Sequence, residues 1–594
     1  MNNKFLAIMA GIMTGAALLT GCSTSRKQAA EKSTLARIDM TKWLYNSEDN
    51  VYYQTGISYA ANPADSEYES LGLYVPGAYF TGKDNGDGTY TVSVNKNGTQ
   101  NGFTVEDAPY VIPIETPGYS AMSAPDGYPS AVKEFTDSGL IFIYSGARGR
   151  EHGAPAGVTD FKAAIRYVRY NKNQLPGDTV KIFSFGMSGG GAQSAILGAS
   201  GDSPLYDDYL AEIGAVMTES DAIYGSMDWC PITNLNVANE AYEWELSASR
   251  DFSDEFTKDL SDRLAEQFAI YINQLGLKDQ NGNTLSLSNE GEGIYQSGSY
   301  YDYLLSAVEE SLNTFLASQT FPYDPSVQQA NTNMPMLSTP NFGGRGPADF
   351  RKAEKRTDAP EAAPEGMPEQ GERKGPDFEN IDNVKRTENT SGVTISGVYE
   401  TVQDYIDALN ANGQWVIYNP ETNTAKITSL ADFSKAVKNA TKSVGAFDDL
   451  NASQGENTLF GYNDGKGAHW DPIMGELLKG SKYEEAWSED LAKTDSLGKT
   501  VAVRANMYNP LYYISDYYEG SGSSTLAKYW RIRSGIFQGD TAVSTELILA
   551  TALQNAGVEN VDFQAVWGLK HVQAEVSGTP AQNFIQWVIS CSKD

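Results

Sequence analysis

A glycine-rich turn around one serine, placed directly after a strand-like segment, constrains this chain most. Residues 179–194 read TVKIFSFGMSGGGAQS. The β-branched and aromatic residues at its start predict a strand, and the small residues that follow predict a helix packed closely on a sheet. Between them lies a Gly-x-Ser-x-Gly motif centred on Ser188. Glycines at such a turn let strand and helix approach each other, with the serine held in the strained turn.

Two other glycine-rich turns bind phosphate groups, and neither fits this segment. A Walker-type loop needs Lys-Ser/Thr after its last glycine, but Ala192 and Gln193 stand there. A dinucleotide fingerprint needs Gly-x-Gly-x-x-Gly, but the second glycine, Gly189, comes one position late. The segment therefore predicts the nucleophile elbow of an α/β-hydrolase with Ser188 as nucleophile. The simpler alternative is a loop whose serine only caps a helix.

Strand-like and helix-like segments alternate at both ends of the chain, which predicts a mostly parallel sheet covered on both faces. From about residue 226 the sequence becomes helical, aromatic and acidic, and the alternation returns near residue 500. We therefore predict an α/β-hydrolase core with a large inserted, mainly helical lid domain. The expected parts are a signal peptide (1–22), a tether (23–45), the first part of the core (46–225), the lid (226–500) and the second part of the core (501–594).

Residues 340–395 differ from the rest of the lid. They are dense in Pro, Gly, Glu and Arg and hold few aliphatic side chains. Such a segment cannot bury enough apolar area to offset the entropy of ordering it, so we predict that it is disordered.

The N-terminus reads MNNKFLAIMAGIMTGAALLTGC, with Lys4 before a short apolar run that ends in Leu-Thr-Gly-Cys22. It resembles a bacterial lipoprotein signal, and the resemblance implies that Cys22 is lipidated and becomes the mature N-terminus. We therefore expect an exported protein, lipid-anchored at the bacterial cell surface or outer membrane. The alternative is a plain secretory signal.

The net charge of -32 argues against binding nucleic acid through its phosphates and fits a solvated exported surface. With Cys22 lipidated, only Cys230 and Cys591 remain, and they are either one disulfide or two buried thiols. The oligomeric state is left open.

A general base for Ser188 has to come from the three histidines. His571 follows the last predicted strand, where this fold places its base, and Asp540 follows the penultimate strand, where it places the acid. Asp540 could instead cap the next helix. His152 and His469 lie in an early loop and in the lid. Because the histidines are scattered and lack close ligand partners, we expect no metal site and no cofactor.

The oxyanion hole is expected to use two backbone N–H groups. One belongs to Gly189, directly after the nucleophile. The second comes from the loop after YVIPIET, from Gly118 or Tyr119. The alternative for this PGYS segment is a simple turn.

A resemblance to the bacterial tannases, α/β-hydrolase esterases that cleave esters of gallic acid, extends from about residue 50 to the end, apart from the low-complexity segment. It rests on GMSGGGAQSAILGASGD, CPITNLNVANEAYEW, AVKNATKSVGAFDDLNASQGENTLFG, YWRIRSGIFQGDT and VWGLKH. The resemblance implies that Lys442 and Glu456, 14 positions apart, bind galloyl hydroxyls. A buried pair of this kind rejects substrates that lack the hydroxyls, because its charges are then left without partners. Without the resemblance, the sequence favours a different interpretation, in which the two residues form a charge pair on the surface.

The chain departs from the family at one place. Tannases often carry Asp-x-Asp where this chain reads Gln538-Gly539-Asp540. Asp540 could therefore be the triad acid or a galloyl contact, with Gln538 replacing the acid in the second case. Met187 and Val572 exclude the disulfide that joins the serine and histidine loops in fungal tannases and some feruloyl esterases.

The predicted function is hydrolysis of galloyl esters of hydrolysable tannins and of simple gallate esters through an acyl-enzyme. Two alternatives are a feruloyl or other aromatic-acid carboxylesterase, and a polyphenol-binding lipoprotein that has lost activity.

Overall fold

The structure is a computed structural model that describes residues 35–334 and 392–593, except Pro125, Ser253, Asn331, Asn333, Asn439 and Gly465. The residues from Leu35 onward belong to one unit. Cys22 and residues 340–391 lie outside the described residues, so their predicted lipidation and disorder stay predictions.

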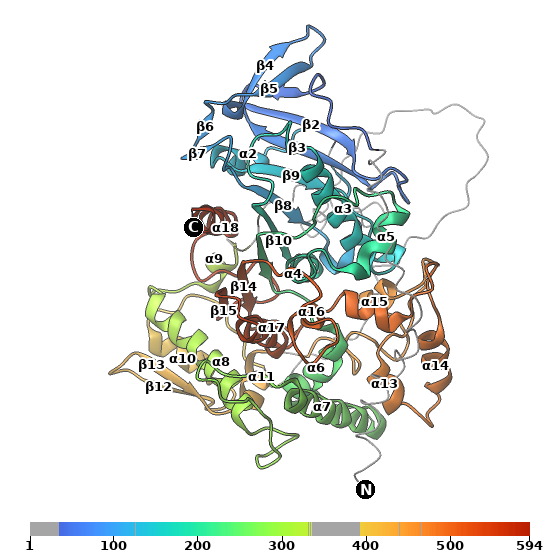
Figure 1. Cartoon of the computed structure of the whole chain (residues 1–594). Helices are drawn as coiled ribbons and strands as arrows, with labels where there is room; N and C mark the ends of the chain where they lie inside the picture. Colours follow the sequence, from blue (N-terminus) through green and yellow to red (C-terminus); the bar gives the residue numbers. More distant parts are fainter. Residues whose placement is uncertain are drawn as a thin grey trace, which may run out of the picture. The chain divides into compact units, whose positions relative to one another are not determined.

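Within the described residues, nine strands form one central sheet in the order β1-β2-β3-β9-β8-β10-β11-β14-β15 (Figure 1). The strands from β9 to β15 pair in parallel, whereas β1, β2 and β3 join β9 as an antiparallel extension. The predicted α/β architecture is confirmed; the antiparallel edge was not anticipated. The strands are β1 (Leu44–Asn46), β2 (Val51–Ser58), β3 (Ser70–Pro76), β8 (Tyr110–Ile114), β9 (Ile141–Ser145), β10 (Ile182–Met187), β11 (Gly225–Trp229), β14 (Tyr529–Gly535) and β15 (Asn560–Val566).

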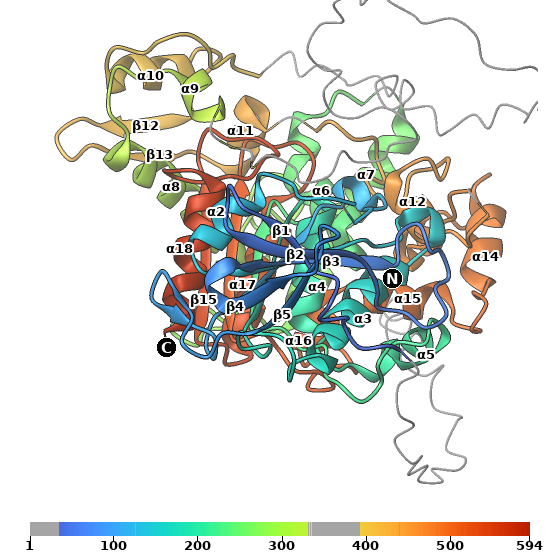
Figure 2. The ribbon, with the colours of Figure 1, turned by 90° about the horizontal axis from the view of Figure 1, so that it is seen from above.

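Helices cover both faces of the sheet, as Figures 1 and 2 show. On one face lie α2 (Val132–Asp137) and α18 (Pro580–Ser592), where Phe584 packs 4.3 Å from Phe185 of β10 between ring centroids. On the other lie α3 (Ala156–Tyr170), α4 (Gly189–Ala199) and α17 (Val543–Asn555). Small hairpins, β4 (Phe80–Asp84) with β5 (Tyr90–Val94) and β6 (Thr99–Gln100) with β7 (Phe103–Thr104), precede β8.

The chain leaves the sheet after β11 and returns to it at β14. Because β11 spans residues 225–229 and β14 begins at Tyr529, the excursion begins a few residues later than the predicted border at 226 and ends later than the predicted border at 500. It is mainly helical, but it also holds a hairpin of β12 (Val416–Asn419) and β13 (Thr424–Ile427) beside α8 and α10. Its helices are α6 (Ala238–Leu246), α7 (Glu255–Leu275), α8 (Ser299–Ser318), α9 (Pro325–Ala330), α10 (Val402–Leu409), α11 (Leu430–Val437), α12 (Gly455–Leu459), α13 (Pro472–Leu477), α14 (Glu484–Ala492), α15 (Val501–Met507) and α16 (Pro510–Ile514).

Local signals set the bounds of these helices. The longest helix of the described chain, α7, begins where the Asp254 carboxylate accepts a hydrogen bond from the Thr257 N–H, and it ends at Gly276, which has a φ of 72°. An acidic N-cap satisfies a free N–H of the first turn, and glycine adopts a left-handed φ without a steric cost.

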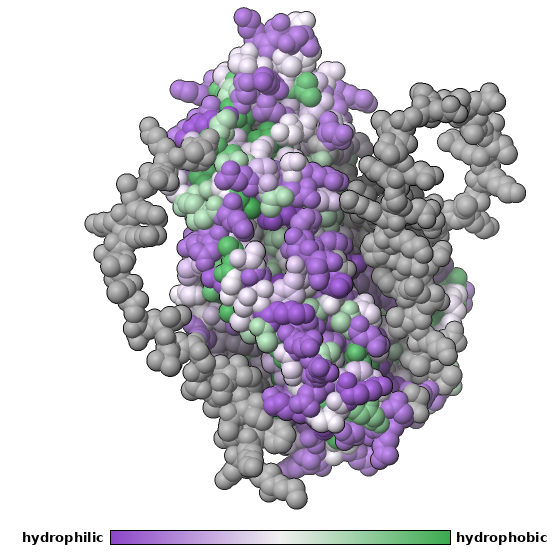
Figure 3. All heavy atoms as spheres, turned by 90° about the vertical axis from the view of Figure 1, so that its right-hand side faces the viewer, coloured by the Kyte–Doolittle hydropathy of each residue, from purple (hydrophilic) through white to green (hydrophobic). Residues whose placement is uncertain are grey.

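The face of the molecule in Figure 3 is predominantly hydrophilic, with small scattered apolar patches. This fits the net charge of -32. In the part of the chain that the structure describes, no helix is long and apolar enough to cross a membrane.

Buried acidic groups connect a later part of the excursion to α6, its first helix. Asp448 accepts hydrogen bonds from the backbone N–H groups of Trp470 and Asp471, and its Oδ1 lies 2.7 Å from His469 Nδ1. Asn239 of α6 donates to Asp471 and accepts from the Phe447 N–H. These bonds hold residues 447–471 against the helix that follows the core strand.

Glu240, next to Asn239 in α6, is fully buried among these groups. Within the described part of the chain, neither of its carboxylate oxygens has a hydrogen-bond partner. Burial raises the pKa of Glu240 well above its usual value, and the charge of Asp471 raises it further. The buried carboxyl of Glu240 is therefore shifted towards its neutral form.

At the nucleophile turn, helix α4 lies directly on the sheet. A Cβ atom on Gly190 would be 2.0 Å from the carbonyl oxygen of Ile114 in β8, and one on Gly186 would be 2.4 Å from the carbonyl carbon of Gly190. Atoms cannot approach so closely, so a side chain at either position would push α4 away from the sheet. The glycines of the motif are therefore required by packing.

We predict that Gly190→Ala lowers the free energy of unfolding by about 1–3 kcal/mol, the usual cost of overpacking a core. Chemical denaturation monitored by circular dichroism measures the change. Gly127→Ala is the matched control, because a Cβ on Gly127 meets no atom within 4 Å. Equal stability of the two variants would contradict the packing argument.

We also predict that Glu240→Gln becomes more stable relative to wild type as the pH rises. A carboxyl whose pKa is raised in the folded state contributes stability below its unfolded pKa and loses it as the pH rises through the folded pKa. Glutamine has no such loss. The free energy of unfolding of Glu240→Gln should therefore rise relative to that of wild type by about 1 kcal/mol or more between about pH 5 and pH 8, because one pKa unit corresponds to about 1.4 kcal/mol. Thermal unfolding across this pH range measures the difference in stability, with the exposed Glu266→Gln as control. Parallel stability curves for Glu240→Gln and wild type would contradict a raised pKa of Glu240.

Candidate active site

Ser188 stands at the turn between β10 and α4 in a conformation that few residues adopt. Its φ is 60° and its ψ is -125°, and its N–H donates to the carbonyl oxygen of Trp229 at the end of β11. Backbone strain of this kind persists where the surrounding structure fixes it, often at functional sites. Ser188 is 7% exposed, so its hydroxyl is largely shielded from water.

His571 reaches Ser188 from the loop that follows β15. Its Nε2 lies 2.8 Å from the Ser188 Oγ. Backbone hydrogen bonds hold the loop, since the Phe537 N–H donates to the carbonyl of Leu569. The Cys230 thiol also donates to the carbonyl of Val572. The structure therefore brings together the residues predicted to be nucleophile and base.

Cys230 and Cys591 are both buried, and no disulfide joins them to each other. The single bridge between them, one of the two possibilities left open by the sequence, is therefore not formed. Burial raises the pKa of Cys230 to about 12, which keeps it a neutral thiol.

The other ring nitrogen of His571 meets an amide. Its Nδ1 lies 2.5 Å from Oε1 of Gln538, in the turn between β14 and α17. An amide oxygen can only accept, so this contact requires a proton on Nδ1 and leaves the Nε2 lone pair directed at Ser188. The prediction that Asp540 supplies this acceptor is corrected here. Gln538 is nearer the strand end, and its long side chain reaches the ring.

Asp540 acts on His571 through its charge. Burial lowers the pKa of His571, the Asp540 carboxylate opposes this by raising it, and Lys442 and Lys438 lower it again. A lowered pKa keeps the imidazole neutral near pH 7, which is the form that accepts a proton.

The expected oxyanion donors lie close together, Gly189 at the start of α4 and Gly118 in the Pro117–Tyr119 turn. The Cα of Gly189 is so close to the Pro117–Tyr119 turn that a Cβ there would lie 2.6 Å from the Tyr119 nitrogen and 3.1 Å from the Gly118 nitrogen. The Tyr119 N–H already donates to the carbonyl of Thr116. Of the two alternatives from the sequence, the Gly118 N–H is therefore the better candidate for the second donor.

Arg150 fixes this turn from outside. Its Nη1 donates to the Gly118 carbonyl at 3.0 Å, and Gly118 and Tyr119 have left-handed φ values of 56° and 60°. Helix α12 packs against the same turn. This brings Glu456 near the nucleophile, and its charge raises the pKa of Tyr119, which burial already raises.

Lys442 and Glu456 form the predicted pair. The Lys442 Nζ lies 4.0 Å from Oε2 of Glu456 and 3.8 Å from the centre of the Phe447 ring. The lysine side chain is 16% exposed and the glutamate 6%. Since Lys442 also lowers the pKa of His571, the pair lies within electrostatic range of the base. An exposed surface pair, the simpler alternative from the sequence, does not fit this burial.

The segment that carries Lys442 is held by α6 and by an arginine. The Tyr242 hydroxyl accepts from the Lys442 N–H and donates to the carbonyl of Gly539. Arg250 donates to the Lys442 carbonyl while it pairs with the buried Glu243 at 2.6 Å. These contacts tie the pair to the same turn that carries Gln538 and Asp540.

The remaining histidines have other surroundings. His469 stacks on Trp487 and pairs with Asp448. His152 lies 3.3 Å from Asp65. No cluster of three or more His, Cys, Asp or Glu residues that could bind a metal is found within the described ranges.

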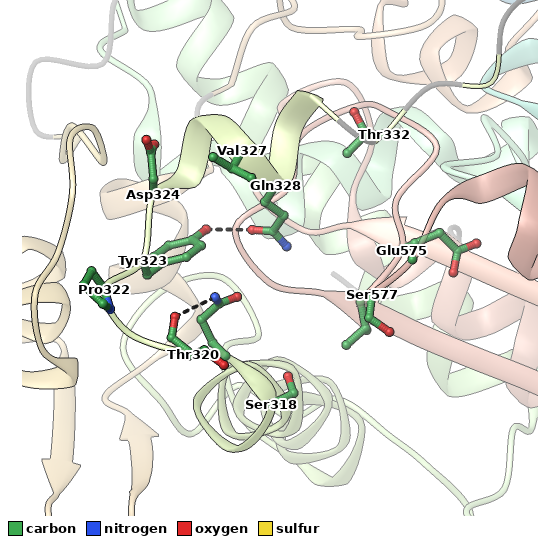
Figure 4. A pocket seen from close by; sticks show the side chains of 13 residues that line it. Ser318, Thr320, Pro322, Tyr323, Asp324, Val327, Gln328, Thr332, Glu575 and Ser577 are labelled. Carbon is green, nitrogen blue, oxygen red and sulfur yellow. Dashed lines mark hydrogen bonds between the residues drawn. The ribbon is translucent and has the colours of Figure 1, made fainter.

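Two surface cavities are lined by residues other than Ser188 and His571. Figure 4 shows one of about 400 Å³, between the end of α8, the segment leading into α9 and the loop at Glu575–Gly578. On its wall the Tyr323 hydroxyl donates to Gln328 Oε1 at 2.6 Å. The other, of about 670 Å³, lies beside the end of α7.

Comparisons with known proteins agree with this architecture. A tannin acyl hydrolase from Lactobacillus plantarum is 24% identical, with a TM-score of 0.61 over 91% of this chain and 94% of that chain. A tannase from Fusobacterium nucleatum is 24% identical, with a TM-score of 0.62 over 95% and 98%. A tannin acyl hydrolase in complex with ethyl gallate is 24% identical, with a TM-score of 0.59 over 91% and 94%.

A family model described as BD-FAE matches residues 101–269, which include Ser188. No protein of the curated set matches the sequence. The predicted resemblance to the bacterial tannases is thus confirmed at the level of the fold. The chain has the α/β-hydrolase fold in the form that solved bacterial tannases share.

Proposed function

We propose that this protein is a serine esterase that hydrolyses galloyl esters of hydrolysable tannins and simple gallate esters. One observation carries the proposal: the Ser188 Oγ lies 2.8 Å from Nε2 of His571, beside the largely buried Lys442–Glu456 pair. The first contact fits acyl transfer, and the second fits recognition of an acyl group that carries hydroxyls.

The chemistry follows from the positions of these groups. His571 Nε2 accepts the Ser188 proton while Oγ attacks the ester carbonyl. The N–H groups of Gly189 and Gly118 stabilise the resulting oxyanion. His571 then protonates the leaving alcohol, and water, deprotonated by the same nitrogen, releases the acid from Ser188. The proposed route needs no cofactor.

The acyl group is inferred from the pair. An ammonium and a carboxylate 4.0 Å apart can donate to and accept from neighbouring phenolic hydroxyls. Solved relatives of the same fold include one in complex with ethyl gallate and one in complex with 3,4-dihydroxybenzoate. A ring without hydroxyls would leave both charges desolvated and without partners, and the site should reject it.

We also propose that the enzyme acts outside the cytoplasm, attached to a membrane by a lipid on Cys22. The support is the lipoprotein-type signal at the N-terminus. The proposed partner is the small galloyl ester alone.

A second candidate is a polyphenol-binding protein without activity, which the neutral Gln538 at the acid position favours. A carboxylesterase for ferulate on the same scaffold is a further alternative. Turnover of methyl gallate excludes the binding protein, and turnover of methyl ferulate at an equal or higher rate would favour the ferulate esterase over our proposal.

We predict that the protein without residues 1–22 releases gallate from methyl gallate, and that Ser188→Ala lowers kcat by about 10⁴-fold or more, since nucleophile and base act as one unit. Liquid chromatography of gallate measures this. Ser220→Ala, at a part-buried hydroxyl that accepts from Arg169, is the control and should keep its rate. Undiminished hydrolysis by Ser188→Ala would exclude the proposed nucleophile.

We predict that Lys442→Met and Glu456→Gln each lower kcat/KM for methyl gallate by about 10²-fold, the value of a hydrogen bond to a charged group. Neither should lower kcat/KM for methyl benzoate, whose ring has no hydroxyls, by more than about threefold. Lys172→Met breaks an exposed pair with Glu219 and serves as the matched control. Equal losses on both esters would show that the pair does not recognise hydroxyls.

A further inference from the structure

The end of the Gln538 side chain that faces away from His571 has its own partners. Gln538 is 1% exposed. Its Nε2 lies 2.9 Å from Ser534 Oγ in β14 and 3.4 Å from Oε1 of Glu546 in the first turn of α17. The amide therefore bridges the catalytic histidine and a buried carboxyl.

The orientation of this amide decides the tautomer of His571. With Oε1 towards the ring, Nδ1 must carry the proton and Nε2 is free to accept from Ser188. If the amide were turned round, its NH₂ group would donate to Nδ1, the proton would move to Nε2, and His571 could not act as a base. In trypsin-like proteases, asparagine in place of the triad aspartate lowers kcat by about 10⁴-fold for this reason.

While Glu546 is ionised, its surroundings favour the first orientation. Its Oε1 accepts from Ser534 Oγ at 3.2 Å and from Thr541 Oγ1 at 2.9 Å, and its Oε2 accepts from Thr545 Oγ1. Because the Ser534 hydroxyl donates to the carboxylate, its oxygen can accept from Gln538. Both neighbours of Gln538 Nε2 thus act as acceptors, and an amide oxygen turned towards them would meet two oxygens.

A buried lysine holds the backbone of this turn. Lys438 is fully buried, and its Nζ donates to the carbonyls of Gln538 at 2.9 Å and Thr541 at 2.7 Å. It lies 3.6 Å from Glu245, whose carboxylate accepts from the backbone N–H groups of Val543 and Ser544 at the start of α17. The backbone of Gln538 is therefore fixed independently of its side chain.

We propose that Glu546 is a positioning residue, which fixes the amide of Gln538 with its oxygen towards His571 and thereby selects the tautomer that activates Ser188. The inference deepens the proposed function and rests on it for the role of Ser188. The working unit is then Ser188, His571, Gln538 and Glu546, in which the carboxylate acts through a neutral amide.

The first test uses two variants of one position. Glu546→Leu removes the acceptor. Glu546→Gln keeps an acceptor for the Gln538 amide. Thr545 Oγ1 can accept a hydrogen bond from the NH₂ group of the introduced glutamine, so the amide oxygen of that glutamine stays directed towards Gln538. Two reactions are followed near pH 8.5, above the pKa of Glu546, which burial raises to about 7. The first is phosphonylation of Ser188 by a fluorophosphonate, which needs no galloyl ester. The second is hydrolysis of methyl gallate, which gives kcat and KM.

We expect Glu546→Leu to lower phosphonylation and kcat by about 10²-fold or more, the usual contribution of a general base. KM should stay within about threefold, because Glu546 lies behind the histidine, and Glu546→Gln should retain most of the rate. Normal phosphonylation of wild type without hydrolysis of any galloyl ester would reject the proposed substrate, and loss of phosphonylation in Glu546→Leu but not in Glu546→Gln would then still support the positioning role.

The second test reads the tautomer directly. The chain has three histidines, so ¹⁵N-histidine labelling gives few signals, and His152→Gln and His469→Gln assign that of His571. We expect Nδ1 protonated and Nε2 unprotonated in wild type and Glu546→Gln, and a shift of the proton to Nε2 in Glu546→Leu.

Three results would overturn the inference. They are a proton on Nε2 in resting wild type, unchanged Ser188 reactivity in folded Glu546→Leu, and equal loss in both variants with no change of tautomer. If Glu546→Leu does not fold, the wild-type spectrum decides alone.

Discussion

The hydrogen bond between Ser188 and His571 joins residues 383 positions apart, and the arrangement of the core serves this contact. It forms because β10, β11, β14 and β15 are consecutive neighbours in the sheet, so that the loops after β10 and β15 meet at its carboxyl edge. The approach of α4 to the sheet sets the position of Ser188, and only glycine fits at Gly186 and Gly190. The excursion between Trp229 and Tyr529 leaves from and returns to adjacent strands, so it does not disturb this frame.

The sequence predicts those parts of the molecule whose signals are local. The strand-turn-helix pattern around Ser188 and the apolar runs of the parallel strands are of this kind, and the position of His571 follows from the order of elements. The antiparallel pairing of β1 to β3 depends on partners distant in sequence, and the β12–β13 hairpin has short strands without a strong turn motif, so neither was predicted.

Gln538 shows why side-chain roles are harder to predict than the fold. By residue type Asp540 was the better acceptor for His571, because an ionised carboxylate is the usual partner of a catalytic histidine. An amide is a suitable partner only if its orientation is fixed, and this depends on Glu546 and Ser534 behind it. Those contacts arise from packing of α17 on β14, which no local sequence pattern specifies.

The charges of this region give a physical reason for a neutral residue there. Glu245 and Glu546 are both buried beside Lys438. Because the Gln538 Nε2 atom lies 3.4 Å from Glu546 Oε1, a carboxylate in place of this amide would add a further buried negative charge close to Glu546, which is costly in a low dielectric. The amide avoids this repulsion. It offers less stabilisation to the imidazolium that forms during the reaction, and Asp540 supplies part of that through its charge.

The most direct test of the central claim is to trap the acyl-enzyme. The protein is mixed with methyl gallate, quenched in acid within milliseconds to seconds, and digested for mass spectrometry of the peptide that contains Ser188. The account predicts a galloyl group on Ser188 that disappears as free gallate accumulates. Gallate release with no galloyl group on Ser188 at any time, or with the group on another residue, would contradict it.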